Sequence, residues 1–296
     1  MREYLSTFRQ TILPVLTVIA VIMAFWYAMV PVMNAPYERD QAVRDKREMT
    51  TAQMIARTYA QEKPILPAPH QVLAEISKTT LGLKVTSKRS LIYHAWVTLS
   101  STLLGFAFGT ALGVLIAVGI VYSKALDKSL MPWIITSQTI PILAIAPMVV
   151  VVMAAMGVTG VLPKAIISTY LSFFPVAVGM VKGLTSPEPM QLDLMRTYNA
   201  SGTQMFSKLR WPSALPYLFT SMKVAIAISL VGAIVGELPT GAQAGLGARL
   251  LGGSYYGQTI QIWSALFMAA ALAAALVAII SFAHKVVLRR YGLVQA

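Results

Sequence analysis

Residue types that carry out covalent or metal chemistry are few in this sequence, and their spacing does not bring them together. The 296 residues include no cysteine, and the three histidines, His70, His94 and His284, show no H-E-x-x-H spacing. A G-x-S-x-G nucleophile motif and a convergent pair of carboxylates are missing as well. We therefore predict no catalytic residue, no metal site and no cofactor bound by this chain.

Polar side chains inside apolar segments are the other candidates for chemistry. Gln138 and Thr139 precede Pro141 within one apolar run, directly after the hydroxyls of Thr136 and Ser137. Polar groups are costly in hydrocarbon, and carbonyls freed by proline can face a cavity, so this pattern is typical of a transport pathway. Alternatively, the hydroxyls bond back to their own helices and Gln138 pairs with a neighbouring helix. The residues alone leave both interpretations open.

Six apolar runs supply the elements that would position these side chains. Hydrophobic residues make up 56% of the chain and charged residues 12%, compared with about 25% charged residues in ordinary soluble domains. Because backbone groups in hydrocarbon must be paired within the segment, runs of about 20 apolar residues are expected to cross the bilayer as helices. We predict spanning helices over residues 12–33, 93–122, 130–156, 164–184, 214–236 and 259–283. Pro141 and Pro147 are predicted to interrupt the third of them, and the first is too long for a cleaved signal peptide, so it is predicted to be a retained anchor.

The basic residues are placed for lipid rather than for nucleic acid. The formal net charge is +13, but Lys and Arg lie between the apolar runs and in the tails, without a basic stripe interleaved with aromatics. Arg2, Arg9, Arg289 and Arg290 are predicted to anchor the tails to anionic lipid. Charge in the short loops favours both termini in the cytoplasm, whereas the ten basic and six acidic residues of segment 34–89 argue the other way.

Segment 34–89 is the only part outside the apolar runs with room for more than a helix or two. Its first half is charged and is predicted to be partly helical. Pro64, Pro67 and Pro69 then punctuate it before a short amphipathic helix, which is predicted over residues 70–78.

Three glycines recur at four-residue spacing in the second apolar run, at Gly105, Gly109 and Gly113. On a helix they form one stripe without side chains, so that another helix can approach closely. We expect this stripe to pack within its own bundle rather than across a dimer, although the spacing suits either partner.

The loop between the fourth and fifth runs, residues 185–213, carries a spaced pattern of residues. It consists of Asp193, Leu194, Met195, Asn199, Leu209 and Pro212. The pattern resembles the EAA loop of ABC-importer permeases, in which an acid, two small residues, a glycine, an aliphatic residue and a proline stand at these spacings. Leu194 and Met195 are larger than the usual alanines. Asn199 replaces the glycine, and Asn is the residue other than glycine that best tolerates a left-handed backbone.

The resemblance implies that loop 185–213 is a coupling helix that receives force from a separate ATPase. We expect a bend at Asn199 between two short helices, the second of them locked by Pro212. The segment expected to meet the ATPase adds these neighbours to the motif residues: Tyr198, Ala200, Ser201, Met205 and Phe206. A plain amphipathic helix that lies on the lipid headgroups is the alternative.

Further segments extend the resemblance, in order, from about residue 66 to residue 291. They read Leu66-Pro-Ala-Pro69, Gln138-Thr-Ile-Pro141, Pro147, Phe173-Phe-Pro175 and Gly245-Leu-Gly247. Together they are similar to the branch of ABC permeases that serves nitrate, sulfonates, taurine and thiamine precursors. The resemblance implies an all-α integral membrane protein with six transmembrane helices, the type-I ABC importer permease fold, whose third and fifth spans line the translocation route. It thereby favours Gln138 in the third span and Ser229 in the fifth as residues of that route.

The same resemblance implies a complex of two permease copies, expected to be a homodimer, with an ABC ATPase dimer and a periplasmic or lipid-anchored substrate-binding protein. Because this chain has no G-x-x-x-x-G-K-[ST] phosphate loop, ATP and Mg would be bound by the partner ATPase. The coupling loop must face that ATPase, which implies a bacterial inner membrane location with both termini cytoplasmic. Glu237 is then expected at a periplasmic gate or in contact with the binding protein, unless it is simply solvated.

The expected organisation follows from these elements. A cytoplasmic N-terminus and first helix occupy 1–33, a periplasmic loop 34–92, a five-helix core with the coupling loop 93–283, and a cytoplasmic tail 284–296. The function implied is the permease of an importer for a small anionic or heterocyclic solute. Two other classes compete with it. An ion-coupled secondary transporter commonly has paired broken helices and an intramembrane acid, whereas the acids here lie almost all in loops. A membrane enzyme would need a group of catalytic side chains, which the sequence does not indicate.

Overall fold

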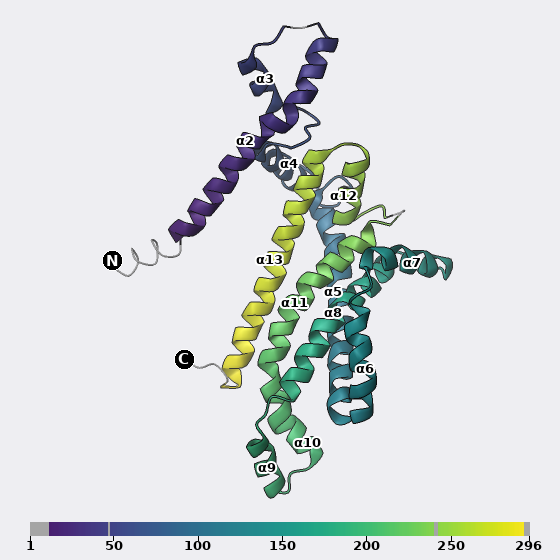
Figure 1. Ribbon diagram of the computed structural model, residues 1–296. Coiled ribbons are helices and arrows are strands. Elements are labelled where there is room, and N and C mark those ends of the chain that lie inside the picture. The colour runs from purple at the N-terminus through teal and green to yellow at the C-terminus, as the bar shows by residue number, and fades with distance from the viewer. Residues whose placement is uncertain (1–11, 47, 240–241, 293–296) are drawn as a thin grey trace. The chain divides into compact units, whose positions relative to one another are not determined.

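The computed structural model of the protein describes residues 12–46, 48–239 and 242–292, and every regular element within these ranges is a helix (Figure 1). Arg2 and Arg9, which the sequence assigns to lipid anchoring, lie outside the described residues. Five described helices are long and apolar enough to cross a membrane, and a bent pair of shorter helices raises the number to six. The five are α2 (Leu13–Arg44), α5 (Leu91–Tyr122), α8 (Val161–Leu184), α11 (Trp211–Glu237) and α13 (Thr259–Arg290).

The third predicted span is divided into α6 (Lys124–Ser137) and α7 (Ile142–Ala155), which meet at 98°. Pro141 caps the start of α7 with an extended backbone, ψ 118°. Proline donates no N–H and disfavours helical backbone at the residue before it, so the break expected at Pro141 is present. The break expected at Pro147 is not, because Pro147 lies inside α7 and the helix continues through it.

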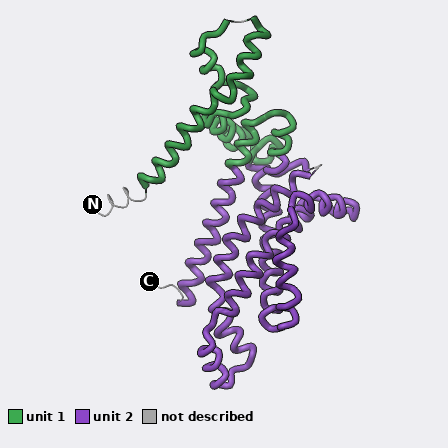
Figure 2. The backbone as a smooth tube through the Cα atoms, viewed as in Figure 1, with its two compact units in different colours: residues 1–91, 249–267 green, residues 92–248, 268–296 purple. Residues whose placement is uncertain are grey.

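The helices form two compact units, which Figure 2 shows in different colours. Residues 1–91 and 249–267 make up the first unit, and residues 92–248 and 268–296 make up the second. The first unit contains α2, α3 (Thr51–Thr58) and α4 (Pro69–Thr80), and α12 (Leu246–Tyr255) and α13 contribute residues to both units.

In the first unit, α2 is longer than the sequence predicts. It continues beyond the expected end at residue 33 to Arg44 and takes in Pro31 and Pro36 without ending. The charged segment that was expected to be partly helical therefore begins as an extension of the first spanning helix.

The buried side chain of Asn34 ties the extended segment before α4 to α2. Its amide oxygen accepts hydrogen bonds from the N–H groups of Ile65 and Leu66 at 2.9 and 3.1 Å, and its amide nitrogen donates to the Leu66 carbonyl at 2.9 Å. Because Asn34 is fully buried, both ends of the amide need partners, and this segment supplies them. The helix predicted over residues 70–78 follows as α4 and is confirmed.

In the second unit, α5 and α8 pack through small residues. A Cβ atom added at Gly105 would lie 2.2 Å from the Ser168 Cβ, and one added at Gly109 would lie 2.0 Å from the Ser172 Oγ. A Cβ at Gly113 would meet the backbone and side chains of α8 at 2.8 Å. All three glycines of the stripe therefore face α8 of the same chain, where only a missing side chain allows the two backbones to lie this close.

Candidate functional site

Loop 185–213 folds into two helical segments joined by a tight turn. These are α9 (Pro189–Thr197) and α10 (Gly202–Met205), which lie between α8 and α11 in the chain (Figure 1). Asn199 occupies the turn with a left-handed backbone, φ 52°, as its residue type predicts. Its N–H donates to the Arg196 carbonyl at 2.8 Å, and the N–H of Ala200 donates to the Met195 carbonyl at 3.0 Å. These bonds pair carbonyls that the end of α9 would otherwise leave free.

Ser201 begins the second helical segment. Its hydroxyl accepts from the N–H of Gln204 at 3.3 Å, and the Gln204 side chain accepts from the N–H of Ser201 at 2.9 Å. This reciprocal capping box satisfies donors at both positions and fixes where the helix starts.

The second segment is not the separate short helix that the sequence suggests. From Gly202 to Glu237 the chain forms one continuous helix of 36 residues, and it passes through a π-helical turn at Phe206–Arg210. Pro212 has no N–H to donate, and its ring crowds the preceding turn. The wider π-helical turn accommodates both effects, and in it the N–H of Trp211 bonds to the carbonyl of Phe206. Pro212 therefore does not end the segment, and any displacement of α10 is passed directly to α11.

Apolar side chains project from α9 and from the turn after it. Leu194 is 56% exposed and Tyr198 is 78% exposed. Met190, which sequence reasoning did not single out, is 75% exposed on the same helix. Beside them, Asp193 and Arg196 form an exposed ion pair with a separation of 2.9 Å. This end of the second unit presents an apolar surface bordered by charge.

The remaining apolar side chains of the predicted coupling segment lie closer to their own chain. Half-buried positions are Met195, Met205 and Leu209. Phe206 packs against the rings of Tyr122 and Trp211, with centroid separations of 6.1 and 5.8 Å. Leu194 and Tyr198, rather than Phe206, therefore offer the surface that a partner would contact.

The polar residues before Pro141 lie at the break between α6 and α7. Thr139 donates to the Thr136 carbonyl at 2.8 Å, and the Gln138 amide lies 3.4 Å from the Ser137 hydroxyl. Tyr170 of α8 also donates to the Ser137 carbonyl. The hydroxyls thus bond back to their own helix, as the sequence allows, whereas Gln138 contacts the adjacent Ser137 rather than a neighbouring helix. The pathway role of Gln138, Thr139 and Pro141 stays a prediction.

Ser229 is fully buried in α11. Its hydroxyl donates to the Thr102 carbonyl of α5, and its carbonyl accepts from the Ser168 hydroxyl of α8, both at 2.9 Å. These bonds join three helices, so helix packing accounts for the hydroxyl, and a pathway role for Ser229 stays a prediction.

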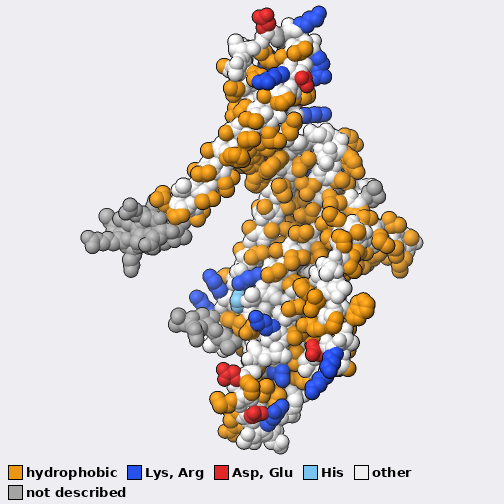
Figure 3. All heavy atoms as spheres, in the orientation of Figure 1, with side chains coloured by type: hydrophobic (Ala, Val, Ile, Leu, Met, Phe, Trp, Pro, Cys, Tyr) orange, Lys and Arg blue, Asp and Glu red, His pale blue; other side chains and the backbone are white. Residues whose placement is uncertain are grey.

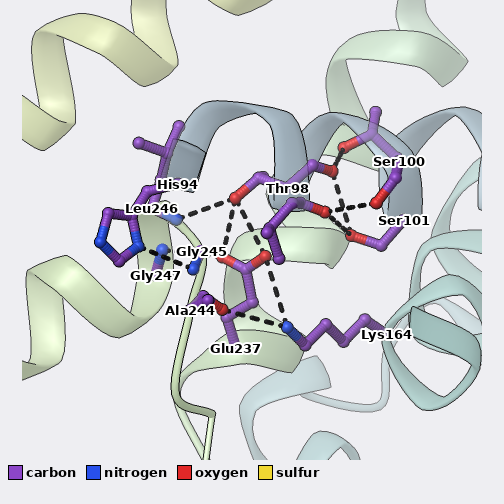
Figure 4. A network of polar contacts seen from close by, with 12 residues as sticks. His94, Thr98, Ser100, Ser101, Lys164, Glu237, Ala244, Gly245, Leu246 and Gly247 are labelled. Atoms are coloured by element: carbon purple, nitrogen blue, oxygen red, sulfur yellow. Dashed lines mark hydrogen bonds and ion pairs between the residues drawn. The ribbon is translucent and has the colours of Figure 1, made fainter. Parts of the chain in front are cut away.

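Glu237 lies at the opposite end of α11, in a network of polar contacts drawn in Figure 4. The Thr98 Oγ1 lies 2.9 Å from each carboxylate oxygen, and the N–H of Gly247 donates to one of them at 2.8 Å. The ammonium group of Lys164 lies 3.8 Å from the carboxylate and donates to the Ala244 carbonyl at 3.2 Å. The acid therefore joins α5, α8 and the segment that follows α11.

The backbone of that segment wraps around the carboxylate. The N–H of Gly245 donates to the Nδ1 of His94 at 3.0 Å, and the N–H of Leu246 donates to the Thr98 Oγ1 at 2.8 Å. With the bond from Gly247, three successive N–H groups are paired with α5 or with Glu237. We call residues 242–247 the outer segment, and its bonds to Glu237, Thr98 and His94 the clasp.

The clasp corrects one of the two expectations for Glu237. Its side chain is fully buried, so it is not an interfacial carboxylate that is merely solvated. The burial also keeps the carboxylate from direct contact with another protein in this conformation. Sequence reasoning missed Thr98 and Lys164 as its partners, and His94 as the acceptor for the N–H of Gly245, because these residues come from other helices.

A cavity of about 580 Å³ lies beside the clasp within the second unit. Its wall includes Tyr93 and Val97 of α5, Thr159, Lys164, and Gln243 with Ala244 of the outer segment. α7 closes another side and presents apolar side chains on its outer surface (Figure 3). Because α8 and α11 run from this cavity to loop 185–213, the cavity and the loop lie at opposite ends of the bundle.

The described helices supply five or six membrane spans, with a stiff loop at one end of the bundle and a cavity at the other. This is the architecture of a multi-pass membrane transport protein.

Comparison with known proteins identifies the family. The model of the family described as "Binding-protein-dependent transport system inner membrane component" matches residues 109–292, and the chain belongs to this family. It is a permease of the ABC-importer type. A probable ABC transporter permease protein of Haemophilus influenzae is 30% identical, covering 67% of this chain and 76% of its own length. The formylaminopyrimidine transport permease protein ThiX of Halalkalibacterium halodurans is also 30% identical, covering 67% of this chain and 72% of its own length.

A solved structure gives the corresponding fold. An inward-facing structure of the MetNI methionine ABC transporter contains a chain that matches this one with a TM-score of 0.57 and 19% identity. The match covers 69% of this chain and 96% of that one. The similarity supports the type-I importer fold that the sequence predicts.

Proposed function

We propose that loop 185–213 is the point at which a separate ATPase drives this permease. The continuity of the loop with the membrane helix carries the proposal, since Gly202 to Glu237 form one helix of 36 residues. A push on flexible coil would be absorbed by bending, whereas a push on α10 reaches the middle of the bundle through α11. The capping box at Ser201 and the left-handed turn at Asn199 keep the lever short and stiff.

The surface offered to the ATPase consists of Leu194, Tyr198 and Met190, with the ion pair of Asp193 and Arg196 at its edge. Exposed aromatic and aliphatic side chains are effective anchors when they enter a pocket on a partner, and charged groups at the rim then set the orientation. In this proposal the two helical segments of the loop have different roles. α9 provides the contact, and α10 transmits the movement.

The orientation follows from the position of the ATPase. Loop 185–213 and both termini lie in the cytoplasm of a bacterial cell whose inner membrane holds the protein, and segment 34–92 lies in the periplasm. ATP and Mg are bound by the ATPase, and the permease itself breaks no covalent bond. Two copies of this chain enclose the route, with an ATPase dimer on one side and a substrate-binding protein on the other.

The solute class we propose is a small anionic or heterocyclic compound. Relatives named for formylaminopyrimidine, for aliphatic sulfonates in Bacillus subtilis and for taurine in Escherichia coli support this range. The cognate binding protein is the direct source of the answer. Mass spectrometry of the ligand that co-purifies with it identifies the solute.

Uptake of that solute into proteoliposomes tests the proposed function. With the permease, its cognate ATPase, the binding protein and ATP, we expect accumulation that stops when the ATPase is omitted. The competing ion-coupled transporter would accumulate the solute under an ion gradient with no ATPase present, and this result would overturn the proposal.

A further inference from the structure

The cavity beside the clasp has the size and lining of a small-molecule site. Its volume of about 580 Å³ falls within the range of roughly 300–1,000 Å³ that is usual for such sites. Its walls are mostly apolar, as at Val97, Val150 and Ala154, and they carry a few polar groups at Thr159 and Gln243. A site of this kind suits a compact solute with an apolar body and a small number of polar atoms.

The charges beside the cavity are arranged asymmetrically. Lys164 forms part of its wall, whereas Glu237 does not, because the carboxylate is fully buried against Thr98 and Gly247. An ammonium group has three donors, and the bonds described for Lys164 engage it with the Ala244 carbonyl at 3.2 Å and the carboxylate at 3.8 Å. The ammonium group of Lys164 therefore places a positively charged hydrogen-bond donor in the cavity wall, whereas the carboxylate of Glu237, which compensates its charge, is not part of that wall.

We propose that this cavity receives the transported solute at the outer end of the permease, and that Lys164 donates a hydrogen bond to an anionic or strongly accepting group of that solute. Glu237 acts as a positioning residue, since it holds both Lys164 and the outer segment that forms one wall. The inference rests on the proposed function, because it takes the solute to enter from the side opposite loop 185–213.

The same geometry limits the class of solute. One ammonium group faces the cavity, and the Glu237 carboxylate lies only 3.8 Å behind it, so a solute with several negative charges is disfavoured. A single carboxylate, sulfonate or ring carbonyl at one end of an apolar body matches the lining.

The test uses the absence of cysteine from the natural sequence. Thr159→Cys places a single thiol in the cavity wall with little change in side-chain volume. In proteoliposomes that hold the permease and its ATPase, the thiol is modified separately by methanethiosulfonate reagents that carry an ethylsulfonate or an ethyltrimethylammonium group. The ratio of the two rates measures the preference of the cavity for an anion, with the sulfonate itself as the probe.

Three further substitutions in the Thr159→Cys background are expected to lower the rate ratio, to raise it and to leave it unchanged, respectively. Lys164→Met should lower the anion-to-cation rate ratio by about three- to tenfold, because the nearby positive charge is removed. Glu237→Gln should raise the ratio, because the amide keeps a hydrogen-bonding oxygen while the negative charge is lost. Lys182→Met, at the other end of α8, should leave the ratio unchanged. A purely structural role for Lys164 and Glu237 would not move the ratio in opposite directions.

Two results would overturn the inference. Equal ratios with and without Lys164 would show that its charge does not act in the cavity, and a thiol that reacts with neither reagent would show that the cavity is closed to water-soluble molecules. Stimulation of ATP hydrolysis by the binding protein, measured on the same proteoliposomes, separates this failure from failure of the proposed function. If stimulation persists while the rate ratio is insensitive to Lys164, only the solute site is wrong.

Discussion

The carboxylate of Glu237 occupies the space that a side chain at Gly245 would fill. A Cβ atom at Gly245 would lie 2.2 Å from the Cδ of Glu237, and the φ angle of 124° at Gly245 is one that residues with side chains rarely adopt. Gly247 is restricted in the same way, since its Cβ would lie 2.3 Å from the Ile234 carbonyl oxygen. The buried Glu237 carboxylate therefore requires glycine at position 245, and Glu237, Gly245 and Gly247 form one structural unit.

Gly245→Ala is expected to open the clasp, because the added methyl group collides with the carboxylate and the backbone is strained. We expect a loss of at least about 1–3 kcal/mol of stability, seen as a lower Tm of the purified protein in detergent. Gly252→Ala is the matched control, since an added Cβ there meets open space. Equal Tm values for the two variants would contradict this account of the clasp.

The contact between α5 and α8 makes a separate prediction about the glycine stripe. In Gly113→Ala the new methyl group would lie 2.8 Å from the Phe173 carbonyl oxygen, and backbone cannot move aside cheaply. We expect a destabilisation of about 1–3 kcal/mol, measured by thermal unfolding. Gly119→Ala on the same helix would meet only the end of the Leu126 side chain at 3.2 Å and should be close to neutral. A neutral result for Gly113→Ala would show that the two helices are further apart than described.

Asn34→Ala should release the segment before α4 from α2. The substitution leaves the buried N–H groups of Ile65 and Leu66 without their acceptor, and each unpaired group costs about 1–3 kcal/mol. Faster proteolysis between residues 58 and 69 would report the release. Gln41→Ala, which removes an exposed amide bonded to Tyr37, should leave the cleavage rate unchanged. Cleavage at the same rate in both variants would mean that Asn34 does not hold the segment.

The left-handed turn at Asn199 predicts an order among substitutions at one position. Asn199→Gly should be tolerated, because glycine adopts φ 52° without cost, whereas Asn199→Val should cost roughly 1–2 kcal/mol locally. We expect Asn199→Val to reduce the stimulation of ATP hydrolysis by the binding protein, while Asn199→Gly retains it. Equal stimulation in the two variants would indicate that the turn does not take part in coupling.

The orientation can be tested with single cysteines and a membrane-impermeant maleimide applied to spheroplasts. Leu81→Cys, at a position 84% exposed in segment 34–92, should be labelled from outside. Tyr198→Cys, at a position 78% exposed in loop 185–213, should be labelled only after the membrane is permeabilised. The reverse pattern would place the loop on the wrong side for an ATPase.

Much of the fold was predictable because apolar length carries the information in a membrane protein. Five predicted runs each fall in a single helix, and Pro141 marks the break in the third run. The length of α2 was not predictable from hydrophobicity, because its second half is charged and includes Pro36. Pro147 was misjudged because a proline inside a helix removes one backbone hydrogen bond without necessarily ending the helix, and α7 continues through it.

The two ends of the second unit differ in how much of their structure the sequence predicts. Loop 185–213 is a local structure, so the spacing of its residues and the backbone preference of Asn199 were enough to predict the turn. The clasp joins residues 139 positions apart, Thr98 and Glu237, and no local pattern marks such a contact. One signal was available. Lys164 lies near the start of one span and Glu237 at the end of the next, so an antiparallel pair of helices brings the two charges to the same level.

Binding of the ATPase through loop 185–213 is the most direct test of the central claim. Tyr198→Asp should abolish or strongly reduce co-purification of the ATPase with the tagged permease, because a charge replaces the apolar anchor. Tyr255→Asp changes a tyrosine of equal exposure, 77% against 78%, in α12 and should retain the ATPase. Full retention of the ATPase by the Tyr198→Asp protein, or equal loss from both variants, would contradict the assignment of this loop as the driven lever.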